Sequence, residues 1–352
     1  MKIALITDTH FGARNDNQII ESYMNKFYEG VFFPYVEENG IDTIIHLGDL
    51  VDRRKSISYL SLKNMQDNFI DVIERKGIET HIIIGNHDCY FRNTNSVNSV
   101  NELYKTSSNI NVYESAETVM FGDFGVCMVP WITRENQEHT LEEVKNTDAS
   151  VLMGHIEVNG FTMHGNAVCE HGFSKNIFKN FEYVFSGHFH VKNDNGQIYY
   201  LGTPYELMWT DSGLDKGFHI FDTDNRELKF IQNPHRLFHK IWYDDKGVET
   251  IDDIMEDFSQ YKDCYIKVIV ANKSNPFFFE KYLESLERVN PANVTILDSD
   301  PVWDDYDEEL IDEAEDTLTI LEKYVEGIEM EIDKYKLNSV LKGIYLEATE
   351  IE

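Results

Sequence analysis

The stretch His81-Ile82-Ile83-Ile84-Gly85-Asn86-His87-Asp88 joins a run of apolar residues directly to three side chains that can bind a metal ion or move a proton. The apolar run predicts a buried strand. Gly85 permits a tight turn at the point where that strand ends. An isolated Gly-Asn-His-Asp tetrad is equally consistent with an ordinary polar turn, so the rest of the chain has to distinguish the two interpretations.

Four other apolar runs end in polar side chains of the same kind. They lead to Asp8 with His10, to Asp49, to His155, and to His188 with His190. Taken singly, each has an ordinary explanation, such as a Gly-Asp turn or a hydrogen-bonded histidine at the edge of the core. In open α/β sheets, however, sites form beyond the carboxyl ends of the strands. We therefore expect these side chains to converge in one crevice.

The spacing of apolar residues predicts an α/β fold for the first part of the chain. Strands over 2–7 and 42–47 alternate with helices over 17–38 and 57–75. Further strands are expected over 111–113, 119–121, 125–130, 149–153, 181–185, 197–201 and 217–222, with one helix near 141–145.

Beyond residue 235 the pattern changes. Strands over 238–243, 265–271 and 293–297 alternate with expected helices near 250–260 and 276–289. An acidic connector follows, and two amphipathic helices predict a C-terminal helical hairpin. The expected domains are therefore 1–235, 236–299 and 300–352.

Composition limits the class of protein. The 352 residues carry a net charge of −32. The four cysteines are far apart and form no CxxC pair, which favours reduced thiols over disulfides or a cysteine zinc site. No apolar run approaches the ~18 residues of a membrane span. The apolar start of the chain is too short for a signal peptide. We expect a cytoplasmic protein without a membrane partner.

A strongly acidic surface repels phosphate backbones, so a nucleic-acid substrate needs a local source of positive charge. Arg53-Arg54-Lys55 is the only run of three basic residues, and it directly follows the Asp49 turn. Arg14, Arg92 and Lys192 lie near other motif turns and could extend this patch. These side chains are equally able to pair with nearby carboxylates on an ordinary surface.

The residue types indicate a two-metal centre. Two divalent cations ~3.5–4 Å apart can clamp the attacking and leaving oxygens of a phosphoryl displacement. Such a pair needs a bridging carboxylate, for which Asp49 is the candidate. Neutral imidazoles and the Asn86 amide leave the centre positive, so that it attracts a phosphate and lowers the pKa of a bound water. Mixed imidazole and carboxylate ligands suit manganese, iron or zinc better than calcium or magnesium.

The order D-x-H, GD, GNHD, GH and GHxH over residues 1–222 resembles that of the calcineurin-like metallophosphoesterases. Gly48-Asp49-Leu50-Val51-Asp52, Gly187-His188-Phe189-His190 and Tyr200-Leu201-Gly202-Thr203-Pro204 narrow the likeness to SbcD-type nuclease subunits of DNA double-strand-break repair complexes. Val129-Pro130-Trp131 and residues 154–160 are most similar to the members from T-even-type bacteriophages. The resemblance implies a β-sandwich core flanked by helices, a small α+β capping domain and a C-terminal helical hairpin.

The resemblance also implies a role for each matched position. Asp49 bridges two divalent metals, with Mn²⁺ expected and Mg²⁺ as the alternative. The first metal is held by Asp8, His10, Asp49 and His190, and the second by Asp49, Asn86, His155 and His188. His87 contacts the substrate phosphate, with Asp88 expected to orient it. Asp52 stands where many cellular members have histidine. The second proton donor or phosphate contact that such a histidine would provide is therefore not expected at this position.

The activity implied by the family is DNA cleavage, as an exonuclease and a single-strand endonuclease, with contacts from Arg53, Arg54 and Lys55. The implied partner is an SbcC-like coiled-coil ATPase that binds the C-terminal helices, with the chain as a homodimer within a heterotetramer. A small-molecule phosphatase or a cyclic-nucleotide phosphodiesterase is an alternative, favoured by the acidic surface. A scaffold with a vestigial metal site is a third possibility, which the complete ligand set disfavours.

Overall fold

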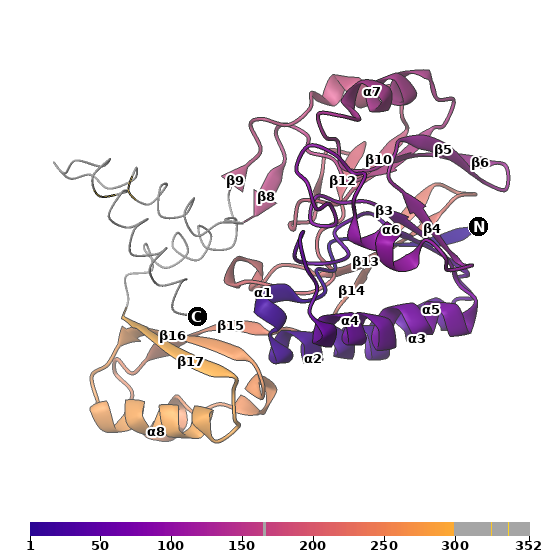
Figure 1. Cartoon of the computed structure of the whole chain (residues 1–352). Coiled ribbons are helices and arrows are strands. Elements are labelled where there is room, and N and C mark those ends of the chain that lie inside the picture. Colours follow the sequence, from indigo (N-terminus) through magenta and orange to yellow (C-terminus); the bar gives the residue numbers. More distant parts are fainter. Residues whose placement is uncertain (165–166, 299–324, 326–336, 338–352) are drawn as a thin grey trace.

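The computed structural model describes residues 1–164 and 167–298, together with the isolated positions 325 and 337. A large α/β part comes first along the chain, and a smaller part built on three strands follows it (Figure 1). The predicted C-terminal hairpin and the domain expected over 300–352 lie outside the described residues, apart from those two positions.

The first sheet of the large part has six strands in the order β14-β13-β1-β2-β3-β4. Strands β1 to β4 run parallel, whereas β13 and β14 add antiparallel at one edge. Strand β14 was not predicted. The bounds are β1 Lys2–Ile6, β2 Thr43–His46, β3 Glu79–Ile83, β4 Ile110–Tyr113, β13 Gly217–Asp222 and β14 Glu227–Gln232.

The second sheet also has six strands, in the order β11-β12-β10-β7-β6-β5. Its four inner strands are parallel and its two edge strands antiparallel. The bounds are β5 Glu117–Phe121, β6 Phe124–Val129, β7 Val151–Gly154, β10 Tyr183–Ser186, β11 Asn193–Asp194 and β12 Ile198–Tyr200. A separate short hairpin consists of β8 Thr162–His164 and β9 Ala167–Val168.

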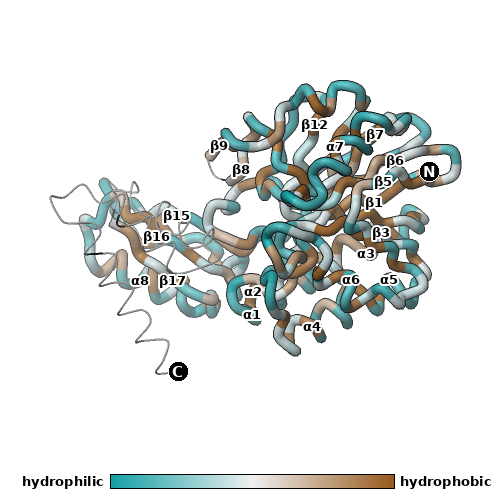
Figure 2. The backbone as a smooth tube through the Cα atoms, turned by 45° about the horizontal axis from the view of Figure 1, so that its top comes forward, coloured by the Kyte–Doolittle hydropathy of each residue, from teal (hydrophilic) through white to brown (hydrophobic). Residues whose placement is uncertain are grey.

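The two sheets pack face to face, as the predicted β-sandwich requires. Ile3 and Leu5 of β1 belong to the buried cluster shared with Met153 and Phe185 of the second sheet. The alternate residues of β1 point the other way, into the core beneath the helices. Because β1 is buried on both faces, its sequence is continuously apolar rather than alternating. Figure 2 shows these hydrophobic strands inside and hydrophilic segments outside.

Two long helical stretches cover the outer face of the first sheet and confirm the helices predicted over 17–38 and 57–75. The first consists of α2 Gln18–Phe27, the π-helical turn η1 Tyr28–Phe32 and α3 Phe33–Glu38. The second consists of α4 Tyr59–Met65, the π-helical turn η2 Gln66–Ile70 and α5 Asp71–Lys76. The other helical segments of the large part are α1 Ala13–Asp16, α6 Ser99–Tyr104, α7 Gln137–Asn146, η3 Lys175–Phe178 and η4 Trp209–Asp211.

The small part is a parallel sheet of β15 Phe238–Asp244, β16 Tyr265–Asn272 and β17 Asn293–Asp298. Helix α8, Pro276–Glu287, packs on it over a separate hydrophobic cluster. The helix expected over 250–260 is wrong, because two 3₁₀ turns occupy it, η5 Ile251–Asp253 and η6 Phe258–Tyr261. Thr250 with Asp253 caps one turn and Asp257 caps the next, so each polar side chain starts a new turn and interrupts a continuous helix.

The junction between the two parts is fixed by a buried carboxylate. Glu206 is 1% exposed. Its Oε2 accepts hydrogen bonds from the Leu237 N–H at 2.7 Å and the Phe238 N–H at 2.9 Å, where β15 begins. Asn17 donates from Nδ2 to the Tyr265 hydroxyl at 2.9 Å, which ties β16 to the start of α2.

Two further expectations concern residue chemistry rather than topology. All four cysteines are free and buried, as the composition predicted. Within the described part of the chain, no helix has both the length and the apolar character that a membrane span needs.

Candidate metal centre

The seven predicted metal ligands meet where strands of both sheets end. Each follows the carboxyl end of an inner strand: β1, β2 and β3 in the first sheet, and β7 and β10 in the second. Ligand atoms of Asp8, His10 and His190 lie within 4.8 Å of one another, as do those of Asp49, His155 and His188. The convergence predicted from strand ends is therefore present.

Glycines before the ligands are required by close packing between the strand-end turns. A Cβ on Gly85 would lie 2.2 Å from Asp49 Oδ1 and 2.3 Å from the Asp49 backbone nitrogen. A Cβ on Gly187 would lie 2.0 Å from Thr7 Oγ1 and 2.8 Å from Asp8 Oδ2. These distances are far below van der Waals contact, so any side chain at either position would displace a carboxylate of the centre.

Four ligands adopt a backbone conformation that non-glycine residues rarely occupy. The φ angles of Asp8, His10, Asp49 and His188 are 51°, 45°, 54° and 84°. Such conformations cost about 1–3 kcal/mol each and cluster at functional sites. Surrounding contacts hold them in place: the Asp8 N–H donates to the Gly48 carbonyl at 3.0 Å, and the His10 N–H donates to the Asp49 carbonyl at 3.1 Å.

The second ligand group is built around His155. Its Nδ1 donates to the Leu47 carbonyl at 2.8 Å, which directs Nε2 toward the centre. That Nε2 lies 3.4 Å from Asp49 Oδ2 and 2.9 Å from Asn86 Oδ1. His188 Nδ1 approaches the same Asn86 oxygen at 3.0 Å. One carboxylate, one amide oxygen and two imidazoles thus point at a common region.

Asp49, of the second group of potential ligand atoms, also lies near the first group. His10 Nε2 lies 3.9 Å from Asp49 Oδ2, 4.0 Å from Asp8 Oδ1 and 3.2 Å from His190 Nε2. Thr7 Oγ1 donates to Asp8 Oδ2 at 2.6 Å and holds that carboxylate. Asp49 Oδ2 therefore lies within 4 Å of ring nitrogens of both groups.

The charge states of three of the four imidazoles suit ligation of cations. Burial, with neighbouring positive groups, lowers the pKa of His10 well below its usual value and those of His188 and His190 to about 3. In His190 the second cause is the Lys216 ammonium. These rings are neutral near pH 7. Burial alone would lower the pKa of His155 too, but the Asp49 carboxylate outweighs it and raises that pKa to about 9.

The donor set fits divalent metal ions. Two neutral ring nitrogens, on His10 and His190, face each other at 3.2 Å, and both groups contain a buried carboxylate. Buried carboxylates without an ion-paired partner are unfavourable, and a bound cation would supply the missing positive charge. Mixed imidazole, carboxylate and amide oxygen donors suit manganese, iron or zinc.

His87 lies at the edge of both groups. Its ring is 4.9 Å from the His10 ring at an interplanar angle of 89°. The His87 backbone N–H donates to Asp49 Oδ1 at 2.8 Å, and its Nδ1 contacts the Asp52 carbonyl. Burial lowers its pKa, but the Asp49 carboxylate and the Asp52 carbonyl outweigh burial and raise it above the usual value.

Asp88 does not orient His87, so that expectation is corrected. Its carboxylate accepts four backbone hydrogen bonds instead, because it is buried between the two turns. Oδ2 accepts from Asp49 at 2.9 Å and Gly85 at 2.8 Å, and Oδ1 accepts from Leu50 at 3.0 Å and Val51 at 3.3 Å. Asp88 therefore fixes the turn that presents Asp49.

Asp52 contacts His87 through its backbone carbonyl, and its carboxylate lies close to a second histidine. Its Oδ1 lies 3.5 Å from His10 Nδ1, and Asp52, His10 and His87 form a third group of potential ligand atoms. The 3.5 Å approach is a charge contact and not a hydrogen bond, because His10 Nδ1 is a buried atom without a hydrogen-bond partner among the described residues.

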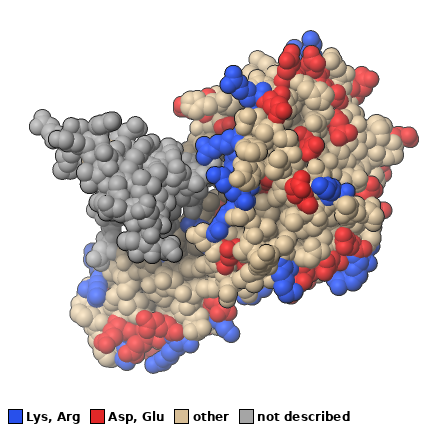
Figure 3. Space-filling view, in the orientation of Figure 1, with Lys and Arg blue, Asp and Glu red and all other residues tan. Residues whose placement is uncertain are grey.

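The basic run begins at the rim of this centre. Arg53 and Lys55 are exposed, Arg54 is half-buried, and Arg53 donates to the Asn15 side chain. Arg14 is held by a 3.3 Å bond from Nε to the Leu207 carbonyl, and the Lys192 ammonium lies 4.0 Å from the centroid of the Phe230 ring. Figure 3 shows basic side chains gathered on the large part between the β8–β9 hairpin and α1.

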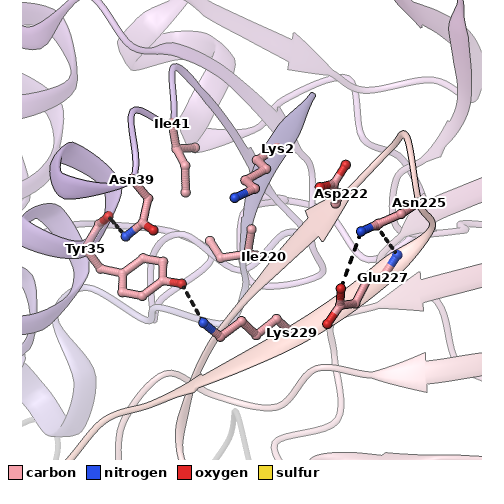
Figure 4. A pocket seen from close by; sticks show the side chains of 9 residues that line it. All are labelled: Lys2, Tyr35, Asn39, Ile41, Ile220, Asp222, Asn225, Glu227 and Lys229. Carbon is pink, nitrogen blue, oxygen red and sulfur yellow. Dashed lines mark hydrogen bonds between the residues drawn. The ribbon is translucent and has the colours of Figure 1, made fainter.

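A pocket at the edge of the first sheet is separate from the candidate centre. Its floor contains Ile41 and Ile220, and Tyr35 accepts from Lys229 at 3.2 Å on one wall (Figure 4). Asp222 and Glu227 offset its two lysines. It contains none of the predicted ligands, so it does not compete with the strand-end site.

Replacing Asp88 tests its structural role. Asp88→Asn places an amide group against backbone N–H donors, and leaving such buried donors unpaired costs about 1–3 kcal/mol each. We expect about 3 kcal/mol lower free energy of unfolding for the metal-free chain, measured with urea. Asp67→Asn, at an exposed ion pair on α4 and η2, is the control and should change stability by under ~0.5 kcal/mol. Equal stability of the two variants would contradict the role given to Asp88.

Comparisons with known proteins agree with this geometry. The profile of the family described as calcineurin-like phosphoesterase matches residues 1–192. Exonuclease subunit 1 of Enterobacteria phage T4 is 30% identical over 355 residues, covering 99% of this chain and 100% of that protein. An archaeal phosphodiesterase structure aligns with 66% of this chain and 100% of its own at 14% identity and a TM-score of 0.33, too low to bear on the fold. The chain belongs to the calcineurin-like phosphoesterases, a family of metal-dependent hydrolases.

Proposed function

We propose that this phosphoesterase is a DNA nuclease subunit that hydrolyses phosphodiesters with two divalent metals. The position of Asp49 is the observation that carries the proposal. Its Oδ2 lies 3.9 Å from His10 Nε2 and 3.4 Å from His155 Nε2, between two groups of potential ligands. A second observation is the near full-length similarity to a phage exonuclease subunit.

Each proposed metal has a complete set of protein ligands. The first would be held by Asp8, His10, Asp49 and His190, and the second by Asp49, Asn86, His155 and His188. When bound, such metals polarise the phosphate and lower the pKa of a water. Mn²⁺ is the ion we propose, and Mg²⁺ is the alternative.

His87 is the proposed general acid. Its Nδ1 contacts the Asp52 carbonyl, and its backbone N–H donates to the Asp49 carboxylate. The ring and the main chain of His87 are therefore both held in place. Its raised pKa favours the protonated ring at neutral pH. The remaining nitrogen, Nε2, can donate a proton to the leaving oxygen of the scissile phosphodiester.

DNA is the proposed substrate because the relative is named an exonuclease subunit and because the basic run 53–55 directly follows the Asp49 turn of an acidic protein. Arg53, Arg54 and Lys55 are the proposed backbone contacts. The proposed domains are a nuclease domain over 1–235, a capping domain that orients DNA over 236–299, and a partner-binding segment over 300–352. The proposed partner is an SbcC-like ATPase, with two copies of this chain in the complex.

Metal-dependent cleavage is the first expected result. The purified chain, given Mn²⁺ and end-labelled single- or double-stranded DNA, should release labelled products on a gel. Asp49→Ala removes the shared ligand and should abolish release at equal protein concentration. Equal cleavage by wild type and Asp49→Ala would reject the proposal. Hydrolysis of p-nitrophenyl phosphodiesters without any DNA cleavage would identify the small-molecule alternative instead.

The tetrad at 85–88 separates ligation from proton transfer. His87→Ala should lower cleavage by about 10²–10⁴-fold while leaving Mn²⁺ stoichiometry unchanged. Asn86→Ala should lower the affinity for one of the two Mn²⁺ ions by at least ~10-fold. Calorimetric titration with Mn²⁺, paired with the gel assay, measures both effects. Loss of a metal in His87→Ala would show that the two roles are assigned to the wrong residues.

The partner proposal depends on the C-terminal segment. A chain truncated after residue 302 should lose association with an SbcC-like coiled-coil ATPase, while it keeps both Mn²⁺ ions. Co-purification of tagged full-length and truncated chains with that ATPase measures the difference. Retained association of the truncated chain would place the docking surface elsewhere.

A further inference from the structure

A buried ion pair lies directly behind the loop that carries His190. Lys216 is 3% exposed and Asp211 is 2% exposed, and Lys216 Nζ lies 2.5 Å from Asp211 Oδ1. Burying two charges is unfavourable unless the remaining hydrogen bonds of both groups are satisfied. None of the sequence motifs includes either residue. The surrounding contacts must therefore explain why two charges are buried here despite the unfavourable free energy of burial.

The Lys216 ammonium has three acceptors. Besides Asp211, it donates to the His190 carbonyl at 2.9 Å and to Thr203 Oγ1 at 2.7 Å. An ammonium has three N–H donors, so its hydrogen-bonding capacity is filled. The same His190 carbonyl also accepts the Thr203 backbone N–H at 3.2 Å. Two donors thus fix the main chain of a proposed metal ligand from behind.

Asp211 anchors the pair at its other end. Its Oδ2 accepts from the Leu207 N–H at 2.9 Å and the Met208 N–H at 3.2 Å, which closes the turn η4. The adjacent Trp209 ring lies 5.0 Å from the Phe238 ring, where the small sheet begins. The ammonium is therefore held on a rigid turn rather than on a flexible surface segment.

We propose that Lys216 is a positioning residue of the metal centre: with Asp211, it holds the His190 carbonyl and thereby sets the direction from which the His190 imidazole reaches its metal. This inference rests on the proposed ligand role of His190. Groups behind the ligands of a metal site commonly change metal affinity by about 10–100-fold when removed.

The test uses the full-length chain with Mn²⁺ and bis-p-nitrophenyl phosphate. Lys216→Met should keep the far-ultraviolet circular dichroism spectrum of the wild type. Its affinity for one of the two Mn²⁺ ions should be lower by about 10–100-fold. At Mn²⁺ concentrations that do not saturate the weakened site, kcat should fall with little change in KM. Lys216→Arg keeps the charge and a donor and should recover part of the affinity. Thr203→Val removes one acceptor without removing the charge and should give a smaller loss of the same kind.

Val144→Ala, a cavity-forming change on α7 remote from the predicted ligands, controls for lower stability alone. If it has the same Tm as Lys216→Met and weakens Mn²⁺ equally, the positioning role is overturned. Unchanged Mn²⁺ affinity in both Lys216→Met and Thr203→Val also overturns it. If Lys216→Met does not fold, Thr203→Val and Lys216→Arg decide the question. A wild-type chain that binds no Mn²⁺ would instead refute the proposed function.

Discussion

The carboxylate of Asp88 is the constraint on which the candidate centre depends. Its two oxygens accept the backbone N–H groups of Gly85, Asp49, Leu50 and Val51, so they join the turn after β3 to the turn after β2. Asp49 sits in that second turn with a φ of 54°. Four hydrogen bonds, at about 0.5–1.5 kcal/mol each, are together strong enough to offset a strained backbone of about 1–3 kcal/mol. The proposed bridging ligand is therefore held in place by a carboxylate that is not among the proposed ligands.

Rigid strands keep the backbone of these turns in its strained conformation. The turns leave from inner strands of two sheets that are packed against each other, and most of these strands are continuously buried. A loop on the surface would relax from a left-handed conformation, whereas a turn between fixed strand ends cannot. Gly85 and Gly187 allow the neighbouring turns to approach closely enough for carboxylates to touch backbone. The packed sheets thus fix the positions of the strand ends, and the turns at those ends carry the proposed metal ligands.

The convergence of the predicted ligands could be foreseen from sequence because each directly follows an apolar strand, and parallel strand ends share an edge. The roles of Asp88 and Asp52 could not, because backbone N–H and carbonyl partners have no sequence signature. Because Asp88 is adjacent in sequence, it was expected to orient His87. The chain turns so that the Asp52 carbonyl contacts the His87 ring instead. Lys216 was missed for a related reason, since its partner His190 is 26 positions away. The helix expected over 250–260 failed because polar caps override apolar spacing.

The distribution of charge has a consequence for how an acidic chain holds a polyanion. With a net charge of −32, the protein as a whole repels a phosphate backbone. At the proposed centre, Asp8 and Asp49 contribute two negative charges against four positive charges from two divalent ions, while neutral imidazoles and Asn86 contribute none. Short-range attraction at the reacting phosphate is therefore independent of the long-range field. Substrate affinity should then depend on bound metal more than on surface lysines and arginines, so a nuclease of this kind can remain strongly acidic.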